Sequence, residues 1–275
     1  ELQCSLIETV ILIFILTLYF GIVMLSIPTL TKGQVNHFLR NGFVVLPKAF
    51  NELEAAIIQE WSLEISQLPE ECDKHWVYHE PSLLLDDKKI INRIENMTPF
   101  HKGFRELAES LKNSVEQLFG EQAVLFKEKI NFKMPGGSGF KPHQDAQAGW
   151  EDYASYFVNV MVCVDAATIQ NGCLQLAQRL NATLIGNEWE PLTEAEISHL
   201  EFEPYPTEPG DIIYFDSYVP HASEPNMTSR SRRLYFATYN RLSEGDHLAS
   251  YYADKRKNFP PDIEREQGKT YIYRV

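Results

Sequence analysis

The sequence has few cysteines and no excess of positive charge, and both shortages exclude classes of function. The 275 residues include only Cys4, Cys72, Cys163 and Cys173, and no two of them form a CxxC pair. A zinc finger or a disulfide-stapled scaffold is therefore excluded, and we expect free thiols in a reducing compartment. Acidic residues outnumber Lys and Arg by 38 to 25, which gives a formal charge of −13. Because nucleic-acid binding needs a basic face, nucleic acid is excluded as a partner.

The sequence also has no internal repeat, no low-complexity stretch and no flexible linker after residue 31. Its 14 Gly and 15 Pro are scattered, so collagen-like and disordered chains are excluded. The content of 44% hydrophobic and 12% aromatic residues is typical of a globular domain. All-β barrels and jelly rolls often use a chain of this length as one unit. We therefore expect one main domain.

One long stretch carries no charge at all. Residues 10–27 read VILIFILTLYFGIVMLSI, which is just long enough to cross a bilayer as a helix. No Lys or Arg precedes this run, so a secretory signal is not expected. Lys32 and Arg40 follow it, and this order leaves the main domain in the cytoplasm if the run forms a single-pass anchor.

A second interpretation of the same stretch stays open. The chain begins with Glu1, and Met24 opens a normal-looking soluble start, so residues 1–23 could be an extension outside the working protein. We divide the chain into an apolar N-terminal segment, residues 1–27, and a main domain, residues 28–275. Contact with a membrane is expected only through the apolar run, and the oligomeric state stays unknown.

Helix signals dominate the first 120 residues. Three helices are expected: Thr31 to Arg40, Asn51 to Ser66, and Thr98 to Gly120. In the helix that starts at Asn51, Glu54 stands three residues farther on, as in a capping box. In the helix that starts at Thr98, Pro99 occupies the first helical position. Apolar residues recur at helical spacing along the third.

Short β-prone runs replace these helices after residue 120. The expected strands are residues 123–134, 156–165, 173–177, 212–215 and 232–239. Turn signals separate them, and residues 192–200 form a short helix in an inserted loop. Helices followed by many short strands predict a mainly β, α+β fold: a double-stranded β-helix, or jelly-roll and cupin-like core, buttressed by the N-terminal helices.

The best candidate for chemistry is GFKPHQDAQAGW, in which His143 and Asp145 are two residues apart. In an extended strand, residues i and i+2 point to the same face, so an imidazole and a carboxylate would converge. Taken alone, the pair also fits a surface ion pair. A similar pair, His199 and Glu201, ends a helical segment where such residues diverge, and we interpret it as a solvated surface feature.

A later segment strengthens the first pair. The buried-strand pattern IIYF leads to His221, and Arg232 stands eleven residues farther on, at the start of the next strand. A jelly roll brings such distant strands side by side. Two His and one carboxylate on one face of an octahedral metal form the facial triad of non-haem Fe(II) oxygenases.

With these residues in family order, the chain resembles the phytanoyl-CoA dioxygenase family of Fe(II)/2-oxoglutarate oxygenases, from about Gly33 to the C-terminus. The resemblance implies that His143, Asp145 and His221 bind Fe(II). It implies a dioxygenase that uses 2-oxoglutarate and O2 as cosubstrates, hydroxylates a C–H bond of a small molecule, and releases succinate and CO2. Because the carboxylate ligand is present, hydroxylation rather than halogenation is expected.

The resemblance also assigns the 2-oxoglutarate site. Arg232 would pair with the distal carboxylate, a task that suits a planar bidentate guanidinium. Ser223 would assist at that carboxylate, and Asn131 would approach the metal-proximal end. Arg230 and Arg233 lie beside Arg232, but strand alternation and the family spacing favour Arg232, and we expect the other two to be solvated surface charges.

The sequence gives weaker evidence about which residues would bind the substrate. Lys127, Lys129 and Lys133 alternate along one strand and share a face. That face is either solvated, as is usual for Lys, or it lines the barrel. In the second case Lys129 would contact the cosubstrate and Lys127 an anionic substrate.

Aromatic residues follow the HxD pair. Trp150, Tyr153 and Tyr156 either wall a substrate pocket, cage a quaternary ammonium, or form ordinary aromatic packing. The loop after Asn171-Gly172 departs from the family pattern, which puts its substrate contacts in doubt.

The tail, residues 245–275, resembles a subgroup that hydroxylates small phosphonates such as 2-aminoethylphosphonate and its methylated forms. The alternatives are a hydroxylase of a lipid, an acyl-CoA or a secondary metabolite, and a catalytically silent jelly-roll binding module.

Overall fold

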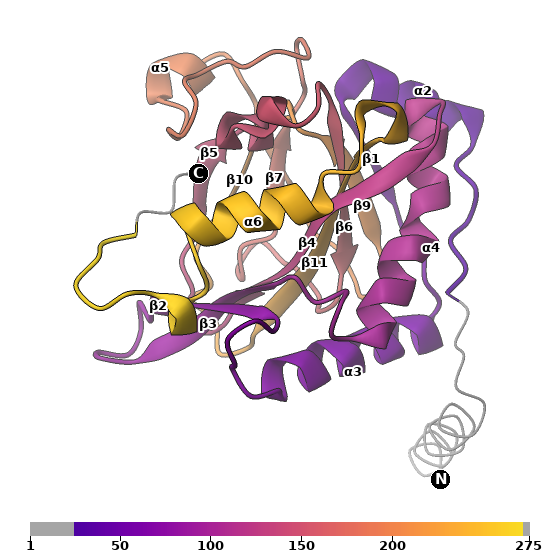
Figure 1. Ribbon diagram of the computed structural model, residues 1–275. Helices are drawn as coiled ribbons and strands as arrows, with labels where there is room; N and C mark the ends of the chain where they lie inside the picture. Colours follow the sequence, from indigo (N-terminus) through magenta and orange to yellow (C-terminus); the bar gives the residue numbers. More distant parts are fainter. Residues whose placement is uncertain (1–24, 272–275) are drawn as a thin grey trace, which may run out of the picture.

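The computed structural model describes residues 25–271, and its first part contains the expected helices (Figure 1). They are α2 (Lys32–Asn41), α3 (Glu52–Gln67) and α4 (Lys102–Phe119). Thr31 caps α2, and Asn51 and Glu54 form the capping box of α3. Gly42 and Gly120 end α2 and α4 in the left-handed conformation.

The third helix begins later than expected, at Lys102 rather than at Pro99. The amides of Met97 and Thr98 donate to one carboxylate oxygen of the buried Glu128, at 2.6 and 3.0 Å. These hydrogen bonds hold the preceding segment as a turn, so the proline lies outside the helix.

The strands pair antiparallel in two sheets. The large sheet has the order β1-β9-β6-β11-β4-β3-β2, with β1 (Phe43–Leu46), β2 (Trp76–Pro81), β3 (Lys89–Glu95), β4 (Ala123–Lys133), β6 (Phe157–Cys163), β9 (Ile212–Asp216) and β11 (Arg232–Arg241). The small sheet has the order β5-β10-β7-β8, with β5 (Phe140–His143), β7 (Leu174–Ala177), β8 (Phe202–Tyr205) and β10 (His221–Ser223). Together they form the expected jelly roll.

Two apolar layers hold the fold together. Helices α3 and α4 lie on one side of the large sheet and the small sheet lies on the other (Figure 1). On the helix side, Phe104 and Leu107 of α4 pack in one cluster with Ile130 and Tyr235. Between the two sheets, a second cluster joins Leu176 with other apolar side chains from both sheets. Full burial of each large apolar side chain contributes roughly 1.5–3 kcal/mol.

The remaining helices and 3-10 turns are α5 (Glu194–Ile197), α6 (Leu248–Asn258), η1 (Asp145–Ala148), η2 (Trp150–Asp152), η3 (Leu242–Glu244) and η4 (Asp262–Glu264). Helix α5 confirms the short helix expected in residues 192–200, but several other elements show no recognisable sequence pattern. The sequence predicts none of β2, β3, β8 or α6. In β3 the charged Arg93 and Glu95 are buried as an ion pair, which breaks the apolar alternation. Helix α6 buries only Tyr251 and Tyr252, so it shows no apolar stripe.

The predicted anchor falls mostly on residues 1–24, which lie outside the described residues. Within residues 25–271, no helix has both the length and the apolar character needed to cross a bilayer. The domain boundary at residue 27 and the cytoplasmic location stay predictions.

Candidate active site

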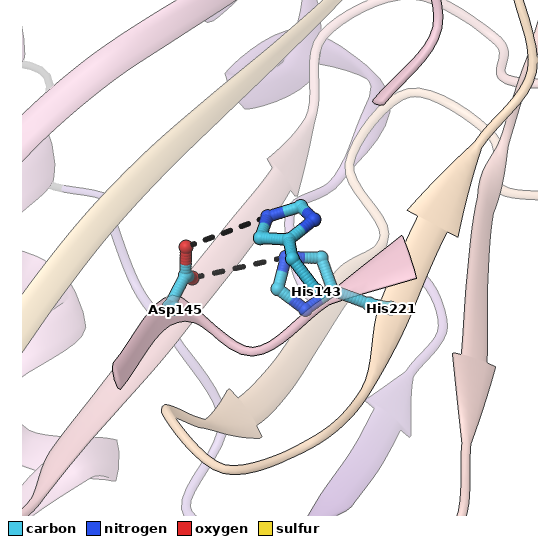
Figure 2. A group of neighbouring side chains, drawn as sticks. All are labelled: His143, Asp145 and His221. Carbon is cyan, nitrogen blue, oxygen red and sulfur yellow. Dashed lines mark ion pairs between the residues drawn. The ribbon is translucent and has the colours of Figure 1, made fainter. Parts of the chain in front are cut away.

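Three potential metal ligands converge where β5 meets β10. His143 ends β5 and His221 begins β10, and the two residues lie directly opposite each other in this strand pair. Asp145 faces both: its Oδ1 is 3.9 Å from His143 Nε2, and its Oδ2 is 3.9 Å from His221 Nε2 (Figure 2). One ligand atom from each residue lies within 4.8 Å of the others.

The backbone element that positions the carboxylate of Asp145 differs from the predicted strand. Strand alternation does not place Asp145, because β5 ends at His143 and Asp145 is the first residue of the 3-10 turn η1. The amide of Ala146 donates to the carbonyl of Ser217 at 2.9 Å and fixes this turn. The predicted convergence is confirmed, but a turn rather than a strand produces it.

Hydrogen bonds around the triad set the orientation of each side chain. Nδ1 of His143 donates to the carbonyl of Lys141 at 2.7 Å, and Nδ1 of His221 donates to that of Val219 at 3.0 Å. These bonds leave both Nε2 lone pairs free to bind a cation. Asn159 Nδ2 donates to Asp145 Oδ2 at 2.9 Å.

The protonation states suit a cation. Burial lowers the pKa of His143 to about 3 and also lowers that of His221, so both imidazoles are neutral at physiological pH. Burial alone would raise the pKa of Asp145, but nearby positive charge, including that of Lys129 and Lys127, outweighs burial, and the pKa is lowered to about 2. The site therefore offers two neutral nitrogens and one carboxylate.

A buried guanidinium lies at one end of the pocket that contains the triad. Strands β11 and β4 place Arg232 opposite Lys133, and Leu234 opposite Asn131. Arg232 is 2% exposed; its Nη2 donates to the carbonyl of Gly172 at 2.7 Å, and its Nε has no partner. Burial lowers its pKa to about 10. Within residues 25–271, Arg232 forms no ion pair with a carboxylate.

Ser223 and Lys133 complete this end of the pocket. Lys133 Nζ donates to Ser223 Oγ at 2.7 Å and to the carbonyl of Glu224. Burial lowers the pKa of Lys133 to about 6. Gly172 has a φ of +77°, and a side chain there would overlap the Glu224 carbonyl, so the Asn-Gly turn needs glycine to bring its own carbonyl to Arg232.

The lysine face of β4 lines the barrel, and the solvated interpretation is wrong. Lys127 and Lys133 are 7% and 1% exposed, and Lys127, Lys129 and Asn131 line the pocket of the triad. A register shift opposite Thr238 places a bulge at Phe126. Bulges change the direction of side chains near functional sites, and here Phe126 and Lys127 both contact the ring of Trp150.

The ammonium of Lys127 already lies against the aromatic residues. Its Nζ is 4.0 Å from the ring centroid of Trp150 and 5.6 Å from that of Tyr251. An aromatic cage for a quaternary ammonium is therefore not available at this Trp150 face. Burial lowers the pKa of Lys127 well below 10.5, and this residue forms no ion pair with any described carboxylate.

A larger cavity of about 810 Å³ opens outward from Lys127. Its walls include Trp150, Tyr153 and, from α6, Tyr251 and Lys255. Helix α6 lies across β4 (Figure 1), so a helix that the sequence patterns did not predict supplies one wall.

Three residues that the sequence brought into consideration line neither the triad pocket nor the outer cavity. Tyr156 donates to the buried Asp216 at 2.9 Å and lines neither cavity. Arg233 faces away from the pocket as expected, but the expectation of a solvated charge is wrong, because it pairs bidentately with Asp165 at 2.7 Å. Arg230 is exposed as expected.

Sequence reasoning missed Asn159, Glu95 and the residues of α6. Asn159 stands in a run of otherwise apolar residues on β6, and a lone amide in a buried strand is the signal that could have identified it. Glu95 bonds Lys255 Nζ at 2.5 Å and Arg93 Nε at 2.7 Å. No sequence pattern links Glu95 to Lys255, which lies 160 residues farther along the chain.

Comparison with known proteins agrees with this geometry. The profile of the phytanoyl-CoA dioxygenase (PhyH) family matches residues 38–234. The chain belongs to this family. It is a dioxygenase that uses Fe(II), with 2-oxoglutarate and O2 as cosubstrates, and it acts on a small molecule.

Two relatives cover most of the chain. It is 43% identical over 248 residues to a 2-aminoethylphosphonate dioxygenase of an uncultured bacterium, HF130_AEPn_1, covering 88% of this chain and 93% of the relative. It is 38% identical over 235 residues to a methylphosphonate hydroxylase of Gimesia maris, covering 84% and 88%.

Solved structures share the fold. The crystal structure of EctD from S. alaskensis with 2-oxoglutarate and 5-hydroxyectoine superimposes with a TM-score of 0.69 at 22% identity, covering 81% of each chain. The carbocyclase SnoK from nogalamycin biosynthesis gives a TM-score of 0.64 at 15% identity, covering 78% and 85%.

Proposed function

We propose that this phytanoyl-CoA dioxygenase family member hydroxylates a C–H bond of a small phosphonate. His143, Asp145 and His221 hold Fe(II), because their donor atoms are free, correctly charged and close together. Iron bound there supplies the activation of dioxygen. The protein's own residues bind the two organic molecules, orient them and exclude water.

The buried cation at the end of the pocket supports the position of 2-oxoglutarate. Among the described residues Arg232 has no carboxylate partner, its Nε is unsatisfied, and an unpaired buried charge is costly. The distal carboxylate of 2-oxoglutarate supplies the missing partner, with Ser223 beside it. Asn131, whose Oδ1 also lacks a partner, and Lys129 face the metal-proximal part of the pocket.

The observation that carries the substrate class is the positive charge of Lys127 and Lys129, which line the same pocket as the triad. The charges of Fe(II) and Arg232 are cancelled by Asp145 and by doubly charged 2-oxoglutarate. Lys127 and Lys129 remain in the pocket without an ion-pair partner among the described carboxylates. A dianion such as a phosphonate matches this excess, and it would raise the depressed pKa of Lys127 again.

The relatives support the same substrate. Two proteins named for 2-aminoethylphosphonate and methylphosphonate align with 88% and 84% of this chain. Lys127 connects the triad pocket to the outer cavity, where Trp150 and Tyr153 provide walls. We assign the phosphonate group to Lys127 and the remainder of the substrate to the outer cavity.

A substrate panel tests this proposal. Protein loaded with Fe(II) and 2-oxoglutarate without oxygen should develop a visible metal-to-ligand charge-transfer band, and O2 should then release succinate with 2-aminoethylphosphonate and methylphosphonate. Absence of the band contradicts the enzyme assignment. A band with turnover only on acyl thioesters, betaines or amino acids contradicts the phosphonate assignment.

Lys127→Met should raise the KM for the phosphonate by about 30-fold, since truncating one partner of a buried charge pair costs at least about 2 kcal/mol. The charge-transfer band and the KM for 2-oxoglutarate should stay unchanged. Lys141→Met is the matched control, because Lys141 is exposed. Equal phosphonate KM values for wild type and Lys127→Met would remove this lysine from the substrate site.

A further inference from the structure

A long connection between β7 and α5 covers the site. Residues 178–192 contain no helix or strand, and they begin within the segment after Asn171-Gly172 that departs from the family pattern. Trp189 forms part of the wall of the outer cavity, and Pro191 forms part of a second cavity that includes His143. The ring of Trp189 lies directly over Gly149, where no side chain would fit.

Two buried glutamines beside the metal ligands hold this connection. Gln144 and Gln147 are both fully buried and flank Asp145. Gln144 Nε2 donates to the carbonyl of Thr183 at 3.0 Å, and its Oε1 accepts from the amide of Ile185 at 2.7 Å.

Gln147 holds the next part of the connection. Its Nε2 donates to the carbonyls of Asn187 and Glu190 at 2.6 and 2.7 Å, and its own carbonyl accepts from the amide of Trp189 at 2.8 Å. The amide of Leu192 also donates to the carbonyl of Pro142 at 2.8 Å.

The side-chain amides of Gln144 and Gln147 use all four of their N–H donors. The second donor of Gln144 Nε2 binds the carbonyl of Tyr218 at 2.6 Å, and Gln147 Oε1 accepts from the amide of Gln144 at 2.8 Å. Because a buried amide without partners is costly, the connection cannot lift from the ligand turn without breaking several of these bonds together. Residues 183–192 and the turn that carries His143 and Asp145 therefore form one hydrogen-bonded unit.

We propose that Gln144 and Gln147 are positioning residues that couple the metal site to the loop over the substrate cavity. This inference rests on the metal assignment proposed above. Metal bound by His143 and Asp145 fixes the turn and thereby the loop, and substrate held against Trp189 stabilises the ligand turn in return, because such coupling is reciprocal.

Hydrogen exchange of residues 183–192 tests the coupling directly. In the wild-type full chain, anaerobic Fe(II) and 2-oxoglutarate should slow amide exchange in this segment by about tenfold. Gln147→Glu retains the acceptor for the Gln144 amide but faces the carbonyls of Asn187 and Glu190 with a carboxylate. We expect this variant to lose the slowing, to raise the substrate KM by about tenfold, and to keep the charge-transfer band.

Gln178→Glu is the matched control. Gln178 lies at the start of the same connection, and its Nε2 donates to Asn41 Oδ1 in an exposed contact at 3.0 Å. This variant should exchange and turn over as the wild type does. If Gln147→Glu does not fold, Ile185→Pro removes the amide that binds Gln144 from the loop side alone, and it should give the same result.

The outcomes separate the two proposals. If the wild type develops no charge-transfer band, the metal assignment fails first. If the band forms but metal leaves exchange of residues 183–192 unchanged, or if Gln147→Glu and Ile185→Pro both retain the slowing, the coupling is refuted and the metal assignment stands.

Discussion

His143→Ala should reduce hydroxylation more than about 1,000-fold and eliminate the charge-transfer band. Loss of an outer-shell partner of a metal ligand typically costs 10–100-fold, and His143 is one of the ligands themselves. Its Nε2 is free and aimed at the carboxylate of Asp145, and no other described imidazole is placed to replace it within this triad. Anaerobic titration with Fe(II), followed by succinate release, measures both effects.

Two further variants provide a comparison for His143→Ala: one is expected to have no effect, and the other a smaller one. His199→Ala alters an exposed histidine in a similar sequence pattern, and it should behave as wild type. Asn159→Ala leaves all three ligands but removes the donor to Asp145 Oδ2, so iron affinity should fall by about 10–100-fold. Equal turnover by His143→Ala and His199→Ala would refute the triad.

Arg232→Met should raise the KM for 2-oxoglutarate by between about 30-fold and several thousand-fold. Removing one partner of a buried, hydrogen-bonded charge pair costs about 2–5 kcal/mol, because the other charge remains buried and unpaired. The triad is untouched, so iron binding should persist. Arg232→Lys keeps a positive charge but loses the planar fork, and an intermediate KM is expected.

Arg233→Met separates this effect from a loss of stability. Arg233 is the next residue on the same strand, but it faces the other side and pairs with Asp165. We expect this variant to lower the melting temperature and to leave the KM for 2-oxoglutarate unchanged. If both variants change that KM equally, Arg232 acts through the fold rather than through the cosubstrate.

The sequence predicted most of the jelly roll because local signals there agree with the tertiary fold. The caps at Thr31 and Asn51 and the glycine stop at Gly120 act within a few residues. The buried strands β6 and β9 are short apolar runs between turns. These features depend only on residues nearby in the sequence, so they can be recognised without knowledge of the tertiary structure.

Other elements depend on distant partners. Glu128 binds the amides before α4 and displaces its start from Pro99. Strand β3 carries the buried Arg93–Glu95 ion pair, and Lys255 of the distant helix α6 also pairs with Glu95. No pattern of period 2 or 3.6 records such pairings.

From the sequence, the HxD pair, the late His221 and the spacing to Arg232 resemble the family pattern and predicted a facial triad, and the structure brings its three residues together. The role of Arg232 in binding 2-oxoglutarate stays a prediction. Only the tertiary structure decided the orientation of the β4 lysines, because the bulge at Phe126 and the ring of Trp150 place Lys127 in the barrel. It also decided how Asp145 reaches the triad and which loop rests on the ligand turn. The physical reason is that residue types set what a site can bind, whereas contacts between distant segments set which side chains face it.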